Sequence, residues 1–373
     1  MPEPRLAYNN ARNQPEVELL LACARTRVSP EVSARIQGAV AKDINWMALV
    51  RLAMRHDVMP LLYHNLQQEC PDSVPQNILA PLRARYQAQA AQAASRVEEL
   101  VRVLSLLEDQ GIPAVPYKGP TLAQRLYGDV ALREFGDLDI MILERDVMRA
   151  QELIRCNGYK FAFLKSADKL AAYIEHNREL QMCRYDGNAL ELHWRFAMRQ
   201  ACVKHDPERF LQRLETISLA GVEMPSLPLE VYLLILSMHA TKHKWRQLKL
   251  ICDFAEILRQ PGLDWQYVLR EADDLGLKRM LAVGILLAEE PLGVAAPAEL
   301  VQGMKKDRAA LALVDQVRES LFEAPDENWY KEAEYQFQFE IRERLQDKAR
   351  MFFWNWWPRI SRRFVPVPDW YAE

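Results

Sequence analysis

Apolar residues follow a helical spacing in the first third of the chain. Over residues 17–110 they recur three and four positions apart, as Trp46, Leu49 and Ala53 do, which is the spacing of one face of an α-helix. The segment 82–107 contains few helix-breaking residues and predicts one long helix. The N-terminal part of the chain is therefore expected to be helical.

The middle of the chain changes to the alternating pattern of a β-strand. Leu138 and Ile140 alternate with Asp137 and Asp139, which predicts a strand with one buried face. Upstream, the short extended run 112–117 contains two prolines. Because proline cannot donate a hydrogen bond to a neighbouring strand, this run is expected to form a sheet edge.

Further segments complete a small sheet with helices between its strands. The runs 179–185 and 189–194 flank the turn-forming sequence Asp-Gly-Asn and predict a β-hairpin. Residues 159–163 predict another strand, and 121–127 and 145–157 predict helices.

These patterns divide the chain into three parts. We expect an N-terminal helical region at 1–110, an α+β core with a small mixed sheet at 111–225, and a C-terminal helical region at 226–373. No internal repeat or low-complexity linker separates them.

Composition narrows the class of protein. The 373 residues include 48 basic and 51 acidic side chains, a net charge of -3, which makes nucleic acid an unlikely partner. The longest near-continuous apolar run, Met280–Ala288, is nine residues, whereas about 20 are needed to span a bilayer. The N-terminus lacks the apolar core of a signal peptide, and the six cysteines form no CxxC pair. We therefore expect a soluble, cytoplasmic protein with reduced thiols.

Paired carboxylates are the main candidate for chemistry. Asp137 and Asp139 lie two residues apart on the predicted strand, so their side chains project from the same face. Two adjacent carboxylates remain ionised only beside a cation, and Mg²⁺ prefers such oxygen ligands. Glu191 is the candidate third carboxylate, which would let two metal ions bind about 3.5–4 Å apart. His193 shares the predicted face of Glu191 and is either its partner or an ordinary half-buried histidine.

A glycine turn upstream of the carboxylates indicates the class of ligand that the site binds. An Asp-x-Asp strand alone can be a solvated face or a charge-protected edge. Lys118 and Gly119, however, lie between a predicted strand and a predicted helix, where backbone N–H groups and a lysine can bind phosphate. Gly119 precedes Asp137 by 18 residues, enough for one helix and a return strand. Strand, turn, helix and acidic strand together predict a nucleotide site.

These residues carry a family resemblance. The segment 117–129, Arg133 and the segment 137–140 together resemble the nucleotidyltransferase superfamily, and more narrowly the bacterial proteins described as uncharacterised nucleotidyltransferases. The similarity extends to 191–194 and to 239–245 with Asp253, and would cover about residues 40–370.

The resemblance implies a fold and a metal site. It implies a small mixed sheet with helices, a glycine turn for nucleotide phosphates, and three carboxylates that bind Mg²⁺. By position, Gly119 matches the glycine turn, Asp137 and Asp139 the paired ligands, and Glu191 the third carboxylate. The superfamily's usual Gly-Ser is Gly119-Pro120 here, and proline has neither N–H nor hydroxyl. Lys118 and Thr121 are the candidates to replace that phosphate contact.

The reaction implied is transfer of a nucleoside monophosphate from an NTP, such as ATP, to a hydroxyl acceptor. Arg133 would neutralise phosphate charge, and its alternative role is that of a surface cation. His193, Lys242 and His243 are candidates to line the acceptor cleft. The competing hypothesis is a catalytically silent nucleotide-binding or scaffold module that acts through a protein partner.

Two other signals leave alternatives open. His239, His243 and Asp253 can form a zinc or iron site, although Lys242 beside them would repel a dication. The aromatic segment 351–358 precedes three arginines. It is expected to dock a terminal helix on the body, the alternative being contact with a protein or a membrane surface.

Overall fold

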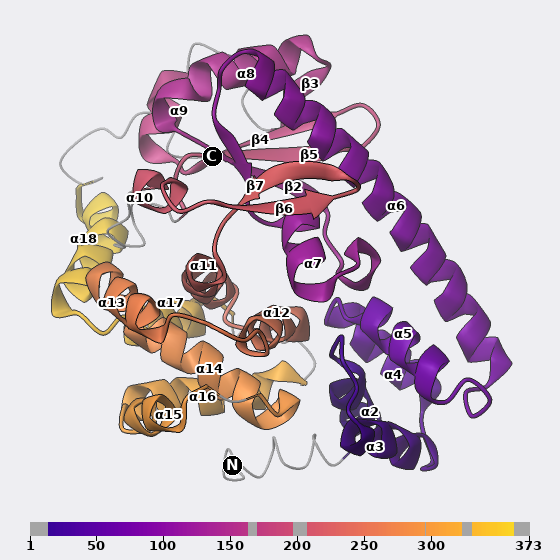
Figure 1. Ribbon diagram of the computed structural model, residues 1–373. Helices are drawn as coiled ribbons and strands as arrows, with labels where there is room; N and C mark the ends of the chain where they lie inside the picture. The colour runs from indigo at the N-terminus through magenta and orange to yellow at the C-terminus, as the bar shows by residue number, and fades with distance from the viewer. Residues whose placement is uncertain (1–13, 163–169, 197–206, 295, 323–329, 362–373) are drawn as a thin grey trace.

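A five-stranded mixed sheet surrounded by helices forms the centre of the molecule (Figure 1). The structure, a computed structural model, describes residues 14–162, 170–196, 207–294, 296–322 and 330–361. The predicted α+β class, with a small mixed sheet between helical regions, is confirmed.

The sheet follows the strand order β1-β2-β5-β4-β3. Strands β2 and β5 run parallel, whereas the other neighbouring pairs run antiparallel. The strands are β1 (Ala114–Pro116), β2 (Asp137–Ile142), β3 (Tyr159–Phe161), β4 (Glu179–Arg184) and β5 (Ala189–His193). The predicted hairpin is β4–β5, and the proline-bearing β1 lies at the predicted edge.

A second hairpin lies outside the elements predicted from the sequence. Strands β6 (Glu215–Leu219) and β7 (Val222–Ser226) form a separate two-stranded sheet. Ala220 and Gly221 join them with positive φ angles of 52° and 80°, as the tightest hairpin turns require. β6 is largely exposed. Ile217 and Leu219 alternate with Thr216 and Ser218, so the strand-like alternation is present but extends over only five residues.

The N-terminal region is helical, as predicted. Its helices are α2 (Pro15–Cys23), α3 (Pro30–Val40), α4 (Trp46–Arg55), α5 (Met59–Glu69) and α6 (Gln76–Asp109). Helix α6 starts earlier than predicted and contains Pro81 in its second turn. Gly111 follows with a φ of 64°, the left-handed conformation that commonly ends a helix.

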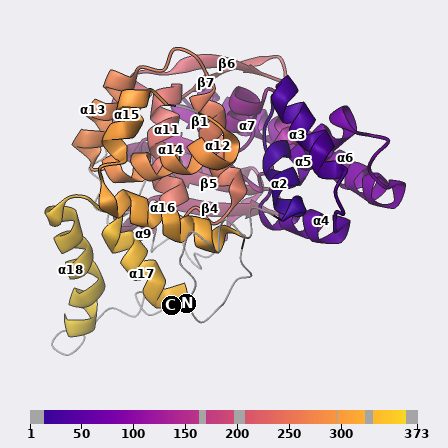
Figure 2. The same cartoon turned by 90° about the horizontal axis from the view of Figure 1, so that it is seen from below.

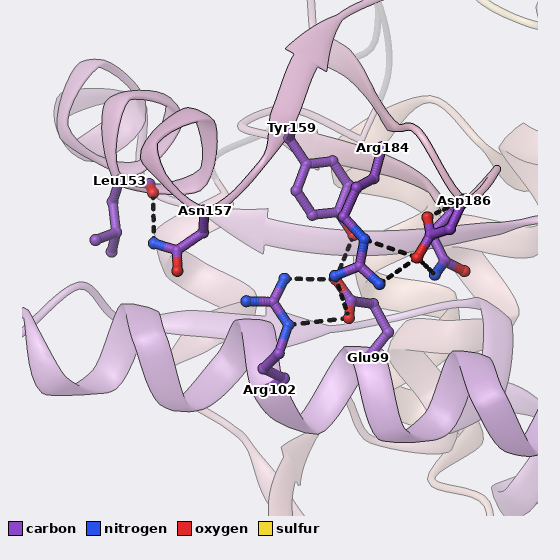
Figure 3. Close-up of polar contacts among 8 residues, drawn as sticks. Glu99, Arg102, Leu153, Asn157, Tyr159, Arg184 and Asp186 are labelled. Carbon is purple, nitrogen blue, oxygen red and sulfur yellow. Dashed lines mark hydrogen bonds and ion pairs between the residues drawn. The ribbon is translucent and has the colours of Figure 1, made fainter.

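A polar cluster fastens α6 to the strands β3 and β4 (Figure 3). The carboxylate of Glu99 accepts hydrogen bonds from Tyr159 at 2.7 Å and from Arg184 at 2.8 Å. Arg102, one turn along α6, donates to the same carboxylate at 2.6 Å. Arg184 also pairs with Asp186 in the β4–β5 turn. The long helix is therefore held across the sheet by charge as well as by apolar packing.

Short helices connect the strands. They are α7 (Gly119–Tyr127), the 3₁₀ helices η1 (Val130–Leu132) and η2 (Glu144–Asp146), α8 (Val147–Cys156), α9 (Leu170–His176) and α10 (Pro207–Leu211). The helices predicted over 121–127 and 145–157 correspond to α7 and α8.

The C-terminal region is a group of packed helices (Figure 2). They are α11 (Leu229–Lys242), α12 (Leu248–Leu258), α13 (Trp265–Leu275), α14 (Lys278–Leu292), α15 (Ala298–Met304), α16 (Arg308–Leu321), α17 (Tyr330–Glu340) and α18 (Leu345–Ser361). Within the described ranges, no helix is both long and apolar enough to cross a membrane. The aromatic segment 351–358 belongs to α18, but its side chains from Trp354 onward lie outside the described residues.

The two faces of the sheet pack against different helices. Leu138 and Ile140 of β2 join an apolar cluster with residues of α6, α8 and α9. Met141, on the opposite face, joins a second cluster that includes α11, α12 and the N-terminal helices. The acidic positions Asp137 and Asp139 share the face of Met141 because side chains alternate along a strand. They therefore point toward the C-terminal helices.

Candidate active site

The parallel pairing of β2 and β5 brings the predicted acidic residues together. Asp139 pairs in register with Glu191, and Met141 with His193. Residues in register on neighbouring strands point to the same side. The site is therefore assembled from two strands that lie far apart in sequence but adjacent in the sheet.

Asp139 lies at the centre of the site and is almost completely buried. Its Oδ1 is 2.7 Å from Lys118 Nζ and 3.0 Å from His193 Nε2. Burial raises the pKa of Asp139, but Lys118 and His193 more than compensate and hold it well below its ordinary value. Asp139 is therefore an ionised, buried carboxylate.

The other two carboxylates lie in different environments. Glu191 accepts a hydrogen bond from Gln181 at 2.8 Å, and its Oε2 is 3.1 Å from His193 Nε2. Burial raises the pKa of Glu191, but the contact with His193 lowers it below the ordinary value overall. Asp137 is half-buried, and burial together with the charges of Asp139 and Glu191 raises its pKa. An added cation would relieve this repulsion.

The donor set suits a divalent cation. Asp139, Glu191 and His193 place one potential ligand atom each within 4.8 Å of one another, and the described ranges contain no other such group. His239, His243 and Asp253, the alternative metal site, therefore do not form such a group. Two carboxylate oxygens and an imidazole nitrogen are common ligands of divalent ions.

The glycine turn lies directly against the first carboxylate strand. Gly119 has a φ of 56°, a conformation that L-residues other than glycine rarely adopt. A Cβ atom at this position would lie 3.0 Å from the backbone oxygen of Asp137. Pro120 occupies the first turn of α7, where a helix makes no use of the missing N–H. The Gly-Pro sequence is thus compatible with the turn and the helix start.

The remaining predicted phosphate ligands, Thr121 and Arg133, are both buried but differ in their hydrogen-bond partners. Thr121 is fully buried, and its Oγ1 has no hydrogen-bond partner among the described residues. Arg133 is buried, and its guanidinium donates two 2.8 Å hydrogen bonds to Asp253 of α12. Tyr127 adds a third bond to Asp253 at 2.7 Å. Arg133 is therefore not a surface cation: it is engaged in a buried ion pair that connects the site segment to α12.

The end of α11 faces the site. Partial desolvation, followed by the positive charges of Arg178 and Lys118, lowers the pKa of Lys242. Burial, followed by the charge of Lys118, holds the pKa of His239 well below its ordinary value. His243 ends the helix and is exposed. The structure thus places Lys242 and His239 within electrostatic range of Lys118.

Two charged residues at the site were missed in the sequence. Glu179 pairs in register with His193 on the antiparallel neighbour β4, and its Oε2 is 3.5 Å from His193 Nδ1. Arg178 pairs with the same Glu179 oxygen at 2.6 Å. The predicted hairpin alone could not reveal this pair. Counting outward from a turn at 186–188 places Glu179 opposite Arg195, whereas the observed register pairs Cys183 with Ala189 and therefore Glu179 with His193.

The fold and the acidic strand pair define a nucleotidyltransferase-like protein. The family model of uncharacterised nucleotidyltransferases matches residues 42–293, which include the turn, both acidic strands and α11. The chain belongs to this family. No curated protein and no solved structure matches the chain significantly.

Proposed function

We propose that the protein is a Mg²⁺-dependent nucleotidyltransferase that moves a nucleoside monophosphate from an NTP to a hydroxyl acceptor. The observation that carries this proposal is the contact between the glycine turn and β2. The Cβ position of Gly119 lies 3.0 Å from the backbone oxygen of Asp137. A helix N-terminus suited to phosphate is therefore adjacent to carboxylates suited to metal ions.

The chain offers three groups for the phosphates. The free N–H groups at the start of α7 face an anion favourably because they are the positive end of the helix dipole. Lys118 precedes them and supplies a positive charge. The Oγ1 of Thr121, which has no partner among the described residues, would gain one, which removes a cost of about 1–3 kcal/mol. Arg133 would act in phosphate neutralisation only if it exchanged its partner Asp253.

Asp137, Asp139 and Glu191 would hold the metal ions, two in the arrangement that the resemblance implies. The bound ions would neutralise the triphosphate and lower the pKa of the acceptor hydroxyl. Glu191 would accept the proton of that hydroxyl. The acceptor oxygen then bonds to the α-phosphorus while the bond from that phosphorus to pyrophosphate breaks in line.

The acceptor would enter from the side of α11. Lys242 and His243 are the candidates to line its cleft, and the C-terminal helices would determine its chemistry. His193, the third predicted lining residue, is fully buried beside Asp139 and Glu191, so it would act on the acceptor only through these carboxylates. We expect a small molecule, sugar or protein hydroxyl, because the net charge of -3 disfavours a nucleic acid. A cytoplasmic location and a bacterial origin also remain predictions, as does a partner or membrane contact through the aromatic segment 351–358.

A second candidate is a catalytically silent nucleotide-binding or scaffold module. The ion pair between Lys118 and Asp139, at 2.7 Å, favours this alternative because the ammonium occupies a cation position beside the central carboxylate. The absence of the usual Gly-Ser points the same way.

Calorimetric titration of ATP, CTP, GTP and UTP with Mg²⁺ distinguishes the nucleotidyltransferase from the catalytically silent module. We expect binding of one nucleotide, loss of that binding in the folded Asp137→Asn/Asp139→Asn variant, and no loss in Asp72→Asn, an exposed aspartate elsewhere. Pyrophosphate release that depends on Asp137 would exclude the silent module. Turnover that survives the double substitution would refute the enzyme.

A further inference from the structure

The Nε2 atom of His193 lies between two carboxylates but can carry only one hydrogen. It is 3.0 Å from Asp139 Oδ1 and 3.1 Å from Glu191 Oε2. A neutral imidazole nitrogen carries at most one hydrogen, so the two contacts either share it in a three-centre bond or one of them has no donor. At Nε2, two carboxylate oxygens therefore face at most one nitrogen-bound hydrogen.

The spacing of these three atoms matches that of ligands around one ion. Metal–ligand bonds of about 2.1 Å at right angles separate neighbouring ligand atoms by about 3.0 Å. The observed separations from His193 Nε2 are 3.0 and 3.1 Å. The imidazole nitrogen is therefore spaced from each carboxylate oxygen as adjacent ligands are, and one potential ligand atom of each residue lies within 4.8 Å of the others.

The second nitrogen of His193 supports this orientation. The ring is completely buried, and its Nδ1 has no hydrogen-bond partner among the described residues. Its neighbour is Glu179 Oε2 at 3.5 Å, which also pairs with Arg178. Metal-bound histidines commonly donate their other N–H to a carboxylate. With the proton on Nδ1, where Glu179 Oε2 at 3.5 Å is an available carboxylate oxygen, the lone pair of Nε2 faces the two acidic oxygens.

We propose that His193 is a metal ligand of this site through Nε2, beside Asp139 and Glu191, and that its imidazole makes the site prefer a first-row transition ion such as Mn²⁺ over Mg²⁺. Imidazole binds transition ions more readily than Mg²⁺, which favours oxygen alone. Glu179 is a positioning residue for the ring. The inference rests on the proposed metal-dependent function and changes the preferred ion, not the reaction.

Lys118 must yield for an ion to bind. Its ammonium contacts the same Asp139 oxygen as His193 does. The side chain is 12% exposed and flexible along its four carbons, so it can turn toward solvent or toward a phosphate. Metal and nucleotide would therefore bind together more readily than either does alone.

Electron spin-echo spectroscopy of Mn²⁺ on the full, metal-stripped chain tests the proposal. A coordinated imidazole gives ¹⁴N modulation, and ¹⁵N-histidine labelling of the unchanged protein should convert that signal to ¹⁵N coupling. In parallel, titration should show Mn²⁺ binding about tenfold tighter than Mg²⁺, with or without a non-hydrolysable ATP analogue.

Variants assign the signal to the residue. His193→Asn should abolish the histidine modulation and weaken Mn²⁺ binding about tenfold or more while affecting Mg²⁺ less. Glu179→Gln should retain the modulation and weaken Mn²⁺ binding by about tenfold. His64→Asn, a substitution on α5, is the matched control and should change neither.

The role of His193 and the metal-dependent function are contradicted by different results. Mn²⁺ bound through Asp139 without any histidine nitrogen signal would overturn the role of His193 and leave the proposed function intact. Equal affinity for Mg²⁺ and Mn²⁺ would overturn the preference. Failure of the unchanged protein to bind either ion, even with the ATP analogue, would contradict the proposed function as well.

Discussion

Asp139 shows how one buried atom can set the cation chemistry of a site. Its Oδ1 contacts both the ammonium of Lys118 and the imidazole of His193. A carboxylate that is 3% exposed needs compensating charge to stay ionised, and Lys118 supplies it. An incoming metal ion must therefore compete with this lysine for the same oxygen.

Replacing that lysine should separate metal binding from nucleotide binding. In Lys118→Met we expect Mn²⁺ affinity to rise by about tenfold, because no ammonium competes for Asp139. Affinity for a non-hydrolysable ATP analogue should fall by about tenfold, because a charged hydrogen bond to phosphate is lost. Both quantities can be measured by calorimetry.

The exposed lysine on β3 provides the control. Lys160→Met removes the same charge outside the site and should leave both affinities unchanged. Weaker Mn²⁺ binding in Lys118→Met would mean that the lysine supports the ion instead of competing with it.

At the scale of elements, the turn before α7 joins phosphate recognition to the acidic strand. Gly119 has a positive φ, and a Cβ atom at this position would lie 3.0 Å from the backbone oxygen of Asp137. Gly128, at the other end of α7, also has a positive φ, of 71°, but has nothing within 4 Å of a Cβ position. Substitutions at Gly119 and Gly128 therefore distinguish the free-energy cost of a positive φ from that of a clash with the backbone of Asp137.

Alanine at these two glycines should therefore have unequal effects. Both substitutions should lower the free energy of unfolding by about 1–2 kcal/mol because of the left-handed backbone. Gly119→Ala should lower it further and also weaken nucleotide binding, since the turn must move away from Asp137. Urea unfolding and nucleotide titration measure the two effects. Equal losses in both variants would show that the close approach does not matter.

The sequence predicted the elements whose patterns are local. The alternation of Leu138 and Ile140 with acidic residues identified β2, and the Asp-Gly-Asn turn identified β4–β5. The role of Glu179 was missed because it depends on the register of the hairpin. The pairing of Arg133 with Asp253 was also missed, since 120 residues separate them and no local pattern encodes such a contact.

At the scale of the whole molecule, the N-terminal and C-terminal helices share one apolar cluster (Figure 2). A polar junction lies where α4 ends and α12 begins. His56 Nδ1 accepts a hydrogen bond from the backbone N–H of Leu248 at 3.2 Å. The carbonyl of His56 accepts another from Lys249 at 3.1 Å. This junction connects parts of the chain that the sequence alone could not place side by side.

The junction should make stability depend on pH. Burial, together with the charge of Arg55, lowers the pKa of His56 to about 3, so its neutral form stabilises the fold above about pH 6.5. That stability is lost as the pH falls toward 3, because the unfolded chain binds the proton more readily. Between pH 7 and pH 5 the loss from His56 should be about 2 kcal/mol.

His56→Asn keeps an acceptor for Leu248 and removes the titrating group. Its free energy of unfolding should therefore fall less than that of the unchanged protein between pH 7 and pH 5, as measured by urea unfolding at each pH. Parallel losses in the two proteins would show that other groups account for the acid sensitivity.

The placement of Glu191 and His193 on β5 has a consequence for how the gene can vary in length. Because side chains alternate along a strand, adding or deleting one residue between Ala189 and Glu191 would turn both groups away from Asp139 and present leucines instead. A change between Glu191 and His193 would turn His193 alone out of the site. The Asp-Gly-Asn tip of the hairpin lies outside the paired residues and can absorb such a change. The chemistry of the site thus fixes the length of the gene segment that encodes β5, whereas insertions and deletions are tolerated in the codons of the hairpin tip just before it.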